Sequence, residues 1–231
     1  MLADTPAAAA DARGAAASGL AVFDLDGTIT RHDTLWGYAH GFMHRHPARA
    51  ARLLATLPAL LRFARHRDHG DLKSAFIRAT LGGRTRAELT AWTGRFVPRL
   101  LERGLRRDAL ARIAAHRAQG DTLVLMSASV DLYVPAIGSA LGFAETLCTP
   151  LVWDGERLDG ALAGVNVRGA AKARALTDLR GRYPGLKVTA YGNAASDLGH
   201  LCLADRGVLV NGRPGTRRAA RGLGLEVVEW R

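Results

Sequence analysis

The sequence predicts an α/β protein in which a mostly parallel sheet carries helices on both faces and a helical segment is inserted after the first strand. Two observations support this fold class. From residue 121 onward, short apolar runs alternate with helical patterns, which is typical of a parallel sheet covered on both sides. Between residues 31 and 118 the apolar spacing is helical and strand-like runs are few.

These patterns divide the chain into three parts. Residues 1–19 lack the basic and leucine-rich stretches of a secretion signal, and we expect them to be a disordered leader. Residues 20–30 and 119–231 form the predicted sheet domain, and residues 31–118 form the predicted helical cap. No run of 18 apolar residues occurs, so no membrane-spanning helix is expected.

The elements of the cap follow from local signals. Helices are expected over residues 53–63, 75–81, 87–101 and 108–117. Gly82 and Gly83 are expected to end the second of these helices. Thr85 and Glu88 have the spacing of a capping box, which predicts the start of the third helix, and Pro98 predicts that this helix is broken or bent there.

The elements of the sheet domain can be placed in the same way. The first strand and its turn are expected over residues 20–30, and further strands over 122–126, 146–153, 157–163, 187–191, 207–210 and 225–228. One helix is expected over 131–141, and another carries Lys172 and ends near Arg182. Asp154-Gly155 predicts a hairpin turn. In parallel sheets the reactive crevice lies beyond the carboxyl ends of the strands. Asp24, Ser127 and Asn193 all follow such ends, as one shared site requires.

The most informative motif is the run VFDLDGT at residues 22–28. In an extended strand the side chains of Asp24 and Asp26 emerge on the same side. Two close negative charges are tolerated when a cation lies between them or when the pair shares acid–base work. The motif therefore indicates either a catalytic carboxylate pair with a metal or an aspartate-rich turn after a strand, with Gly27 as the turn residue.

Three later segments favour the catalytic interpretation. Residues 123–129 (LVLMSAS) form an apolar strand that ends near Ser127, Lys172 opens a helical pattern, and residues 188–197 (VTAYGNAASD) read as a strand and a polar turn. The order DxDGT, serine, lysine, GNxxxD resembles the haloacid dehalogenase superfamily of aspartate-based phosphatases, over residues 20–228. The placement of the cap is similar to that of the phosphoserine-phosphatase-like branch, subfamily IB. The resemblance implies a Rossmann-like core.

The resemblance also implies a reaction and a metal. Asp24 would attack phosphorus to give an aspartyl-phosphate, and Asp26 would act as general acid and then as general base. Mg²⁺ is the expected cofactor, held by Asp24, the backbone carbonyl of Asp26, and the turn that carries Asn193 and Asp197. The predicted function is a Mg²⁺-dependent phosphomonoesterase acting on a small phosphorylated metabolite or a phospholipid head group.

Four further residues are expected to hold the phosphoryl group. The resemblance assigns this role to Ser127, the backbone at Ala128, and Lys172, and Thr28 is expected to support the turn and to touch the phosphate. Lysine is rare here, with three lysines against 29 arginines. A compact ammonium fits between a carboxylate and a phosphoryl oxygen where a planar guanidinium is too large. The competing interpretation of Lys172 is an ordinary surface lysine.

Asn193 departs from the family pattern, which commonly has aspartate at this position. An asparagine offers a metal its side-chain oxygen but no negative charge. Two hypotheses follow: an active enzyme with an altered metal site, or a protein that binds phosphate and does not turn it over. The presence of the nucleophile, the acid, the serine and the lysine favours activity.

Three cap residues are candidate substrate contacts. The resemblance to phosphoserine phosphatases implies that Asp33 meets an amino group of the substrate, but Asp33 could instead cap the first helix of the cap, and capping is favoured. Lys73 and Arg78 could meet a substrate anion, although many arginines lie nearby in the sequence.

Charge and composition restrict the partners. The formal net charge is +11, yet no zinc-finger spacing, RNA-binding aromatic motif or basic dimerisation helix occurs, so nucleic acid is not expected as a partner. The two cysteines lack CxxC spacing and favour a reducing, cytoplasmic location.

The charge is concentrated in the cap. Residues 31–118 carry a net charge of +12, and the rest of the chain carries −1. Within the cap, residues 53–63 are apolar and have arginines on both sides. This pattern is typical either of a helix that lies on an anionic membrane surface, such as the inner membrane, or of a helix whose apolar face packs inside the cap. The second alternative is favoured.

Overall fold

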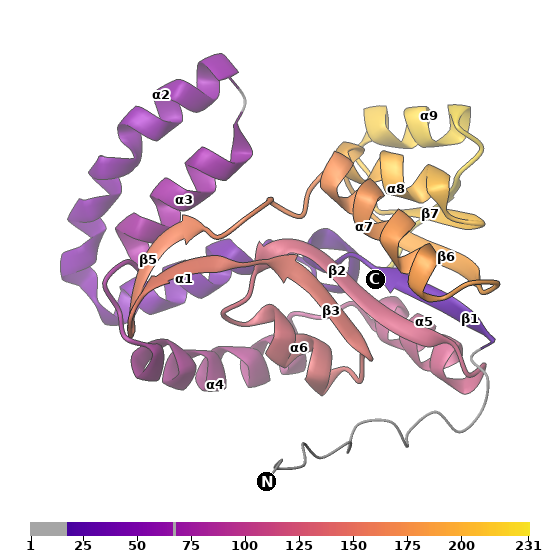
Figure 1. The fold of residues 1–231 in the computed structure, drawn as a ribbon, viewed down its shortest axis with the longest axis horizontal. Helices are drawn as coiled ribbons and strands as arrows, with labels where there is room; N and C mark the ends of the chain where they lie inside the picture. Colours follow the sequence, from indigo (N-terminus) through magenta and orange to yellow (C-terminus); the bar gives the residue numbers. More distant parts are fainter. Residues whose placement is uncertain (1–17, 67) are drawn as a thin grey trace, which may run out of the picture.

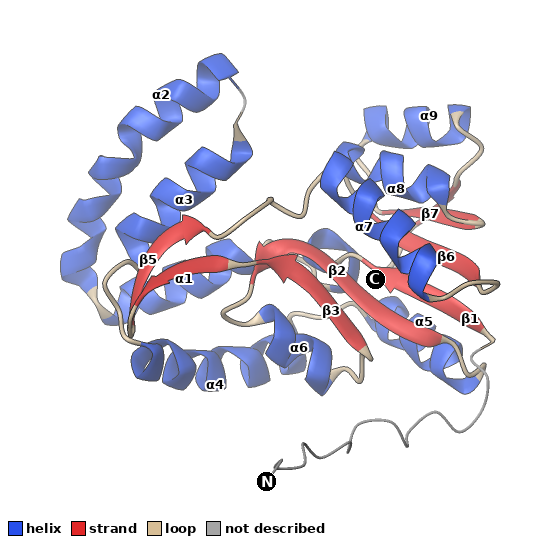
Figure 2. Cartoon of the chain, in the orientation of Figure 1, coloured by secondary structure: helices blue, strands red, loops and turns tan. Residues whose placement is uncertain are grey.

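The computed structural model describes residues 18–66 and 68–231, and a six-stranded parallel sheet forms its centre (Figures 1 and 2). The strand order is β3-β2-β1-β6-β7-β8. The bounds are β1 Gly19–Phe23, β2 Thr122–Val130, β3 Glu145–Thr149, β6 Lys187–Gly192, β7 Arg206–Val210 and β8 Glu226–Val228. The predicted fold class is confirmed. The expected leader lies outside the described residues except for Ser18 and Gly19, and Gly19 begins β1.

The register of the three central strands brings their carboxyl ends to one edge of the sheet. Phe23 in β1 is level with Leu125 in β2 and with Tyr191 in β6. Asp24 directly follows Phe23, and Asn193 directly follows β6. Side chains that lie far apart in the sequence therefore meet beyond these strand ends, where α/β proteins place their binding sites.

Alternate residues of β1 face two different layers of helices. Ala21 and Phe23 pack with α5 (Arg107–Ala118) and α6 (Val134–Ala140), while Leu20 and Val22 pack with α7 (Ala170–Arg182), α8 (Leu198–Leu203) and α9 (Pro214–Gly222). Figure 1 shows the two layers on opposite sides of the sheet. Both faces are apolar because both are covered, as expected for a parallel sheet.

The cap forms an arm beside the sheet (Figure 1). It contains α1 Thr34–Arg45, a 3₁₀ segment Pro47–Thr56, α2 Leu57–His66, α3 His69–Thr80 and α4 Arg86–Arg103. The predicted capping box is confirmed: the Glu88 amide donates to the Thr85 hydroxyl (3.2 Å), and the Thr85 amide donates to the Glu88 carboxylate (2.8 Å). Pro98 lies inside α4. No helix of the described chain is long and apolar enough to span a membrane.

The single strand predicted over residues 146–153 is wrong, because the chain forms two strands there. β3 ends at Thr149 and pairs with β2, whereas β4 (Leu151–Asp154) pairs with β5 (Arg157–Leu162) as an antiparallel hairpin. Pro150 separates the two strands, and proline has no amide to donate to a ladder. The hairpin lies against α3, so part of the chain assigned to the sheet domain packs with the cap.

Candidate active site

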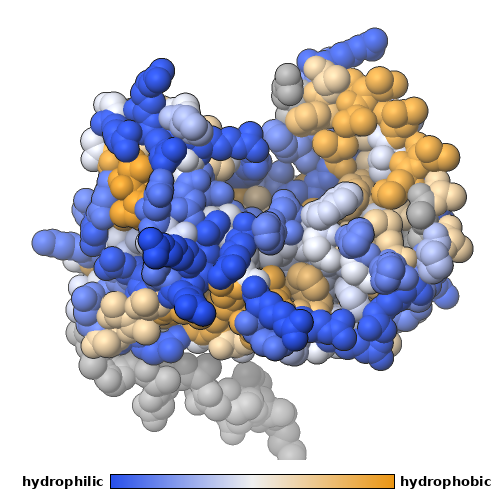
Figure 3. All heavy atoms as spheres, turned by 180° about the vertical axis from the view of Figure 1, so that it is seen from behind, coloured by the Kyte–Doolittle hydropathy of each residue, from blue (hydrophilic) through white to orange (hydrophobic). Residues whose placement is uncertain are grey.

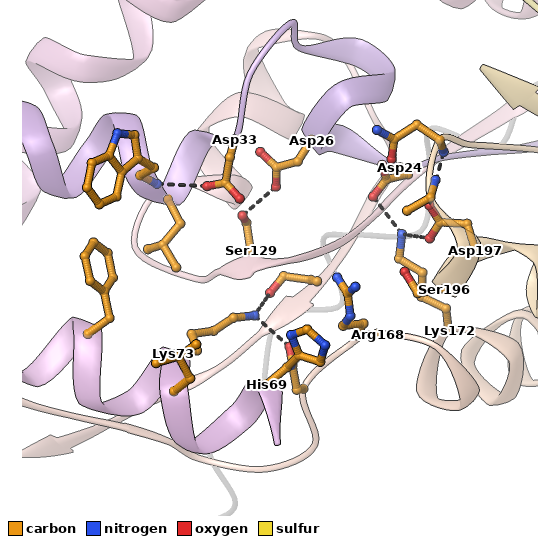
Figure 4. A pocket seen from close by; sticks show the side chains of 18 of the residues that line it. Asp24, Asp26, Asp33, His69, Lys73, Ser129, Arg168, Lys172, Ser196 and Asp197 are labelled. Carbon is orange, nitrogen blue, oxygen red and sulfur yellow. Dashed lines mark hydrogen bonds and ion pairs between the residues drawn. The ribbon is translucent and has the colours of Figure 1, made fainter. Parts of the chain in front are cut away.

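A cavity of about 530 Å³ lies between the carboxyl edge of the sheet and the cap (Figure 4). Asp24 and Asp26 line it from the sheet side. The chain turns sharply between β1 and α1, and Gly27 has the positive φ of 80° that this turn requires. Thr28, which is fully buried, donates a hydrogen bond of 2.8 Å to Asp24 Oδ2 and so orients that carboxylate.

Lys172 joins two buried carboxylates. Its ammonium lies 2.6 Å from Asp24 Oδ1 and 2.9 Å from Asp197 Oδ1. Burial raises the pKa of Asp24, and the positive charge of Lys172 only partly opposes this. Burial would lower the pKa of Lys172, but the charges of Asp24 and Asp197 outweigh it and raise that pKa. The lysine therefore carries its proton and gives the floor of the cavity a fixed positive charge.

Asp26 has separate partners. Its Oδ2 accepts a hydrogen bond of 2.6 Å from the Ser129 hydroxyl, and its Oδ1 accepts one of 2.6 Å from the Thr34 amide. Burial raises the pKa of Asp26, the charge of Asp33 adds to this rise, and the two hydrogen bonds counteract it. Asp26 thus differs from Asp24 in having no direct cation partner among the described residues, which suits a group that holds and releases a proton.

The carboxyl-terminal part of β2, after Met126, presents backbone and hydroxyl groups to the site. Ala128 and Ser129 line the cavity, whereas Ser127 is fully buried and its hydroxyl accepts a hydrogen bond of 3.0 Å from the Ser129 amide. Sequence reasoning named Ser127 and missed Ser129 as the partner of Asp26. The sequence could have indicated Ser129, because it lies two residues after Ser127 on an extended strand, and its side chain therefore emerges on the same side as that of Ser127.

Asn193 packs directly against the turn that carries Asp26. A Cβ atom on Gly27 would lie 1.9 Å from Asn193 Nδ2, so glycine is what lets this side chain approach. Asp24, Asp26 and Asn193 line the same cavity, and the oxygens predicted as metal ligands there (the Asp24 carboxylate, the Asp26 carbonyl and the Asn193 side-chain oxygen) are of the type that suits Mg²⁺. Across the described chain, no group of three or more His, Cys, Asp or Glu side chains could hold a metal by itself.

Asp197 shapes the turn from the other side. Its Oδ2 accepts hydrogen bonds from the amides of Asn193 (3.1 Å) and Ala194 (2.9 Å), while its Oδ1 accepts from Lys172. The charge of Lys172 keeps the pKa of Asp197 low although burial opposes this. These bonds hold Lys172 and the Asn193 turn in place, and the role of Asp197 as a metal ligand stays a prediction.

Two of the three predicted cap residues line the cavity. Asp33 is the N-cap of α1 and accepts a hydrogen bond of 2.8 Å from the Trp36 amide, as the capping interpretation expects.

Lys73 reaches in from α3 and donates to the carbonyl of Ala128 (2.6 Å) and to Asn166 Oδ1 (2.7 Å). Arg78 is not one of the lining residues and pairs with Asp159 on the hairpin (2.8 Å).

The cap side of the cavity is largely apolar, which the sequence did not reveal. Leu35 and Trp36 from α1 face Leu72 and Phe76 from α3, and the rings of Trp36 and Phe76 stack with centroids 5.7 Å apart. Arg168 adds a further cation to the wall (Figure 4). The cavity therefore has a charged floor on the sheet and an apolar wall on the cap, which suits a ligand with an anionic end and an apolar end.

Comparison with known proteins identifies the family. The sequence model of the haloacid dehalogenase-like hydrolases matches residues 21–201. The chain belongs to this family. Protein CicA of Caulobacter vibrioides is 33% identical over 192 residues, which cover 80% of this chain and 83% of CicA.

Several solved structures share the fold of this chain. A Bordetella pertussis Tohama I protein of unknown function superposes with a TM-score of 0.77 at 24% identity, covering 92% of this chain and 98% of that one. A phosphoserine phosphatase solved as a phospho-aspartyl intermediate analogue gives a TM-score of 0.63 at 15% identity, covering 91% of this chain and 92% of that one. At these identities the likeness establishes the fold.

Proposed function

We propose that this chain is a Mg²⁺-dependent phosphomonoesterase that works through a phosphorylated Asp24 on a small phosphorylated metabolite or a phospholipid head group. The observation that carries the proposal is the position of Asp24. Its carboxylate is held by Thr28 and Lys172 at the floor of the cavity, with Asp26 beside it. Family membership and the phosphatases among the structural neighbours support the same reaction class.

The proposed reaction has two steps, and both carboxylates of the motif take part in it. An Asp24 oxygen forms a bond to phosphorus as the bond from phosphorus to the leaving oxygen breaks, and Asp26 gives its proton to that oxygen. Asp26, now ionised, takes a proton from a water whose oxygen attacks the same phosphorus. Inorganic phosphate and the free Asp24 carboxylate result. Burial of Asp26 raises its pKa, which favours the proton-bearing form that the first step needs.

A fixed positive charge would stabilise the negative charge on the phosphoryl oxygens in the transition state. Lys172 carries its charge at the cavity floor before any substrate binds, so no reorganisation is needed during the reaction. When bound, Mg²⁺ would offset the repulsion between the Asp24 carboxylate and the incoming phosphate. Asp24, the Asp26 carbonyl and Asn193 are the groups that would hold it.

Hydrolysis of p-nitrophenyl phosphate tests the proposal. We expect turnover by the wild-type chain with Mg²⁺ and none with EDTA, and we expect Asp24→Asn to lower kcat by about a thousandfold or more. Asp178→Asn is the matched control, because Asp178 is exposed on the same helix as Lys172. Acid-quenched protein should carry a phosphoryl group on Asp24, detectable by mass spectrometry. Full hydrolysis by Asp24→Asn would contradict the assignment.

A second candidate function is phosphate binding without turnover. The observation that favours it is Asn193, which contributes no negative charge to a metal site. The same assay separates the two candidates. Wild-type protein that binds inorganic phosphate by calorimetry, yet releases none from p-nitrophenyl phosphate with Mg²⁺ or Mn²⁺, would support the binding protein.

A further inference from the structure

The outer face of the cap carries an exposed row of leucines. Leu54, Leu57, Leu60 and Leu61 are 78%, 55%, 49% and 61% exposed, and they lie on the 3₁₀ segment and α2. We call these four residues the leucine face. Figure 3 shows the hydrophobic patch over this part of the cap. Isolated exposed leucines are common, but four within eight residues form a contiguous patch that requires a partner.

The opposite side of the same helix is the one that packs. Ala59 is buried, and Thr56 lines the cavity. The helix is amphipathic, yet its large apolar side chains point away from the protein, which is the reverse of an ordinary surface helix. The sequence-based expectation that this apolar face packs inside the cap is therefore wrong for these leucines. Phe63 alone of the large apolar residues in α2 is partly buried.

Arginines border the leucine face. Arg52 and Arg65 are exposed and form no ion pair within the described residues, while Arg62 pairs with Asp71 at 2.8 Å. A second copy docked here by two-fold symmetry would bring the same arginines close to each other, and their repulsion disfavours that partner. An anionic surface complements both the leucines and the arginines.

We propose that the leucine face binds the surface of an anionic lipid bilayer, with the leucines in the acyl boundary and Arg52 and Arg65 among the head groups. This combination of apolar and basic side chains on one helix is the pattern of an interfacial membrane helix. The 3₁₀ segment that precedes α2 also supplies Thr56 to the cavity wall, so binding would hold the cavity next to the lipid surface. Docking is independent of the proposed hydrolysis, and it can be tested without turnover.

Vesicle co-sedimentation of the full chain tests the proposal. We expect the protein to sediment with vesicles of phosphatidylcholine and phosphatidylglycerol, and to remain in solution with phosphatidylcholine alone. The double variant Leu57→Ser/Leu61→Ser should lower the partition coefficient at least tenfold. Arg52→Gln/Arg65→Gln should lower it about fivefold for each arginine removed, and added salt should weaken binding.

Control variants remove the same number of exposed leucines or arginines from a part of the chain outside the leucine face. Leu203→Ser/Leu223→Ser removes two exposed leucines from the sheet domain, and Arg213→Gln/Arg218→Gln removes two exposed arginines there. Both should sediment like the wild type. Thermal unfolding should show that every variant is folded, and hydrolysis of the soluble p-nitrophenyl phosphate by Leu57→Ser/Leu61→Ser should equal that of wild type.

Three results would overturn the proposal. The first is no sedimentation with either vesicle, and the second is equal sedimentation with both. The third is a dimer, seen by analytical ultracentrifugation, that Leu57→Ser/Leu61→Ser dissociates. A chain that binds vesicles but has no phosphatase activity would instead contradict the proposed function alone, so the two failures can be told apart.

Discussion

Lys172 Nζ lies 2.6 Å from Asp24 Oδ1, and both side chains are buried. The same nitrogen reaches Asp197, so one compact cation separates two carboxylates that would otherwise repel each other. An ammonium is a small point charge, whereas a guanidinium is a planar fork with a longer reach. This chain uses arginine at 29 positions but lysine here, which fits the limited space.

Replacing Lys172 should therefore abolish most activity, even when the charge is kept. We expect Lys172→Arg and Lys172→Met each to lower kcat for p-nitrophenyl phosphate by about a hundredfold or more, because neither places a positive charge between Asp24 and the phosphoryl group. Lys187→Met changes an exposed lysine and is the control. Near-normal kcat in folded Lys172→Arg would refute the steric argument.

A methyl group on Gly27 should destabilise the site through Asn193. Gly27→Ala combines a positive φ with a Cβ atom 1.9 Å from Asn193 Nδ2. We expect it to reduce the free energy of unfolding by about 2–4 kcal/mol in the wild type, but by only about 1–2 kcal/mol in an Asn193→Ala background, where the backbone strain alone remains. Urea unfolding of the wild type, the two single variants and the double variant completes this double-mutant cycle. Equal costs in both backgrounds would mean that Asn193 moves away freely.

The central sheet could be predicted because its signals are local. Apolar runs, glycine turns and the Thr85–Glu88 capping box each act within a few residues, and the structure confirms them. The strand break at Pro150 was missed, although proline is a known obstacle to sheet ladders. The apolar runs on both sides read as one strand, and only the pairing partners distinguish β3 from β4.

The residues at the floor of the cavity could also be predicted from the sequence, whereas those of its apolar wall could not. Asp24, Asp26 and Lys172 belong to motifs whose order along the chain indicates chemistry, and the structure brings them together. Trp36 and Phe76 belong to two cap helices, and their stacking depends on how these helices pack. No local signal tells which apolar side chain of a cap helix faces the cavity rather than the core.

Restoring an acid at position 193 should strengthen metal binding. We expect Asn193→Asp to lower the Mg²⁺ concentration that gives half-maximal hydrolysis by about tenfold, because the added carboxylate contributes a negative charge to an oxygen donor set. Mg²⁺ titration of the hydrolysis rate measures this, and calorimetry checks it without substrate. Asn166→Asp is the control, since it adds the same charge on a loop held by Lys73. An unchanged Mg²⁺ requirement would remove Asn193 from the ligand set.

Lys73 should make the affinity of the cavity for an anionic ligand depend on pH. Burial lowers the pKa of Lys73 to about 8, from its ordinary value of 10.5. The side chain is therefore cationic below pH 8 and becomes neutral above it, so KM for p-nitrophenyl phosphate should rise severalfold between pH 7.5 and 9.5. Lys73→Met should have a higher KM at pH 7 and no further rise, while Lys187→Met should follow the wild type. If Lys73→Met keeps the alkaline rise in KM, another group is responsible, and Lys73 only ties α3 to the Ala128 carbonyl.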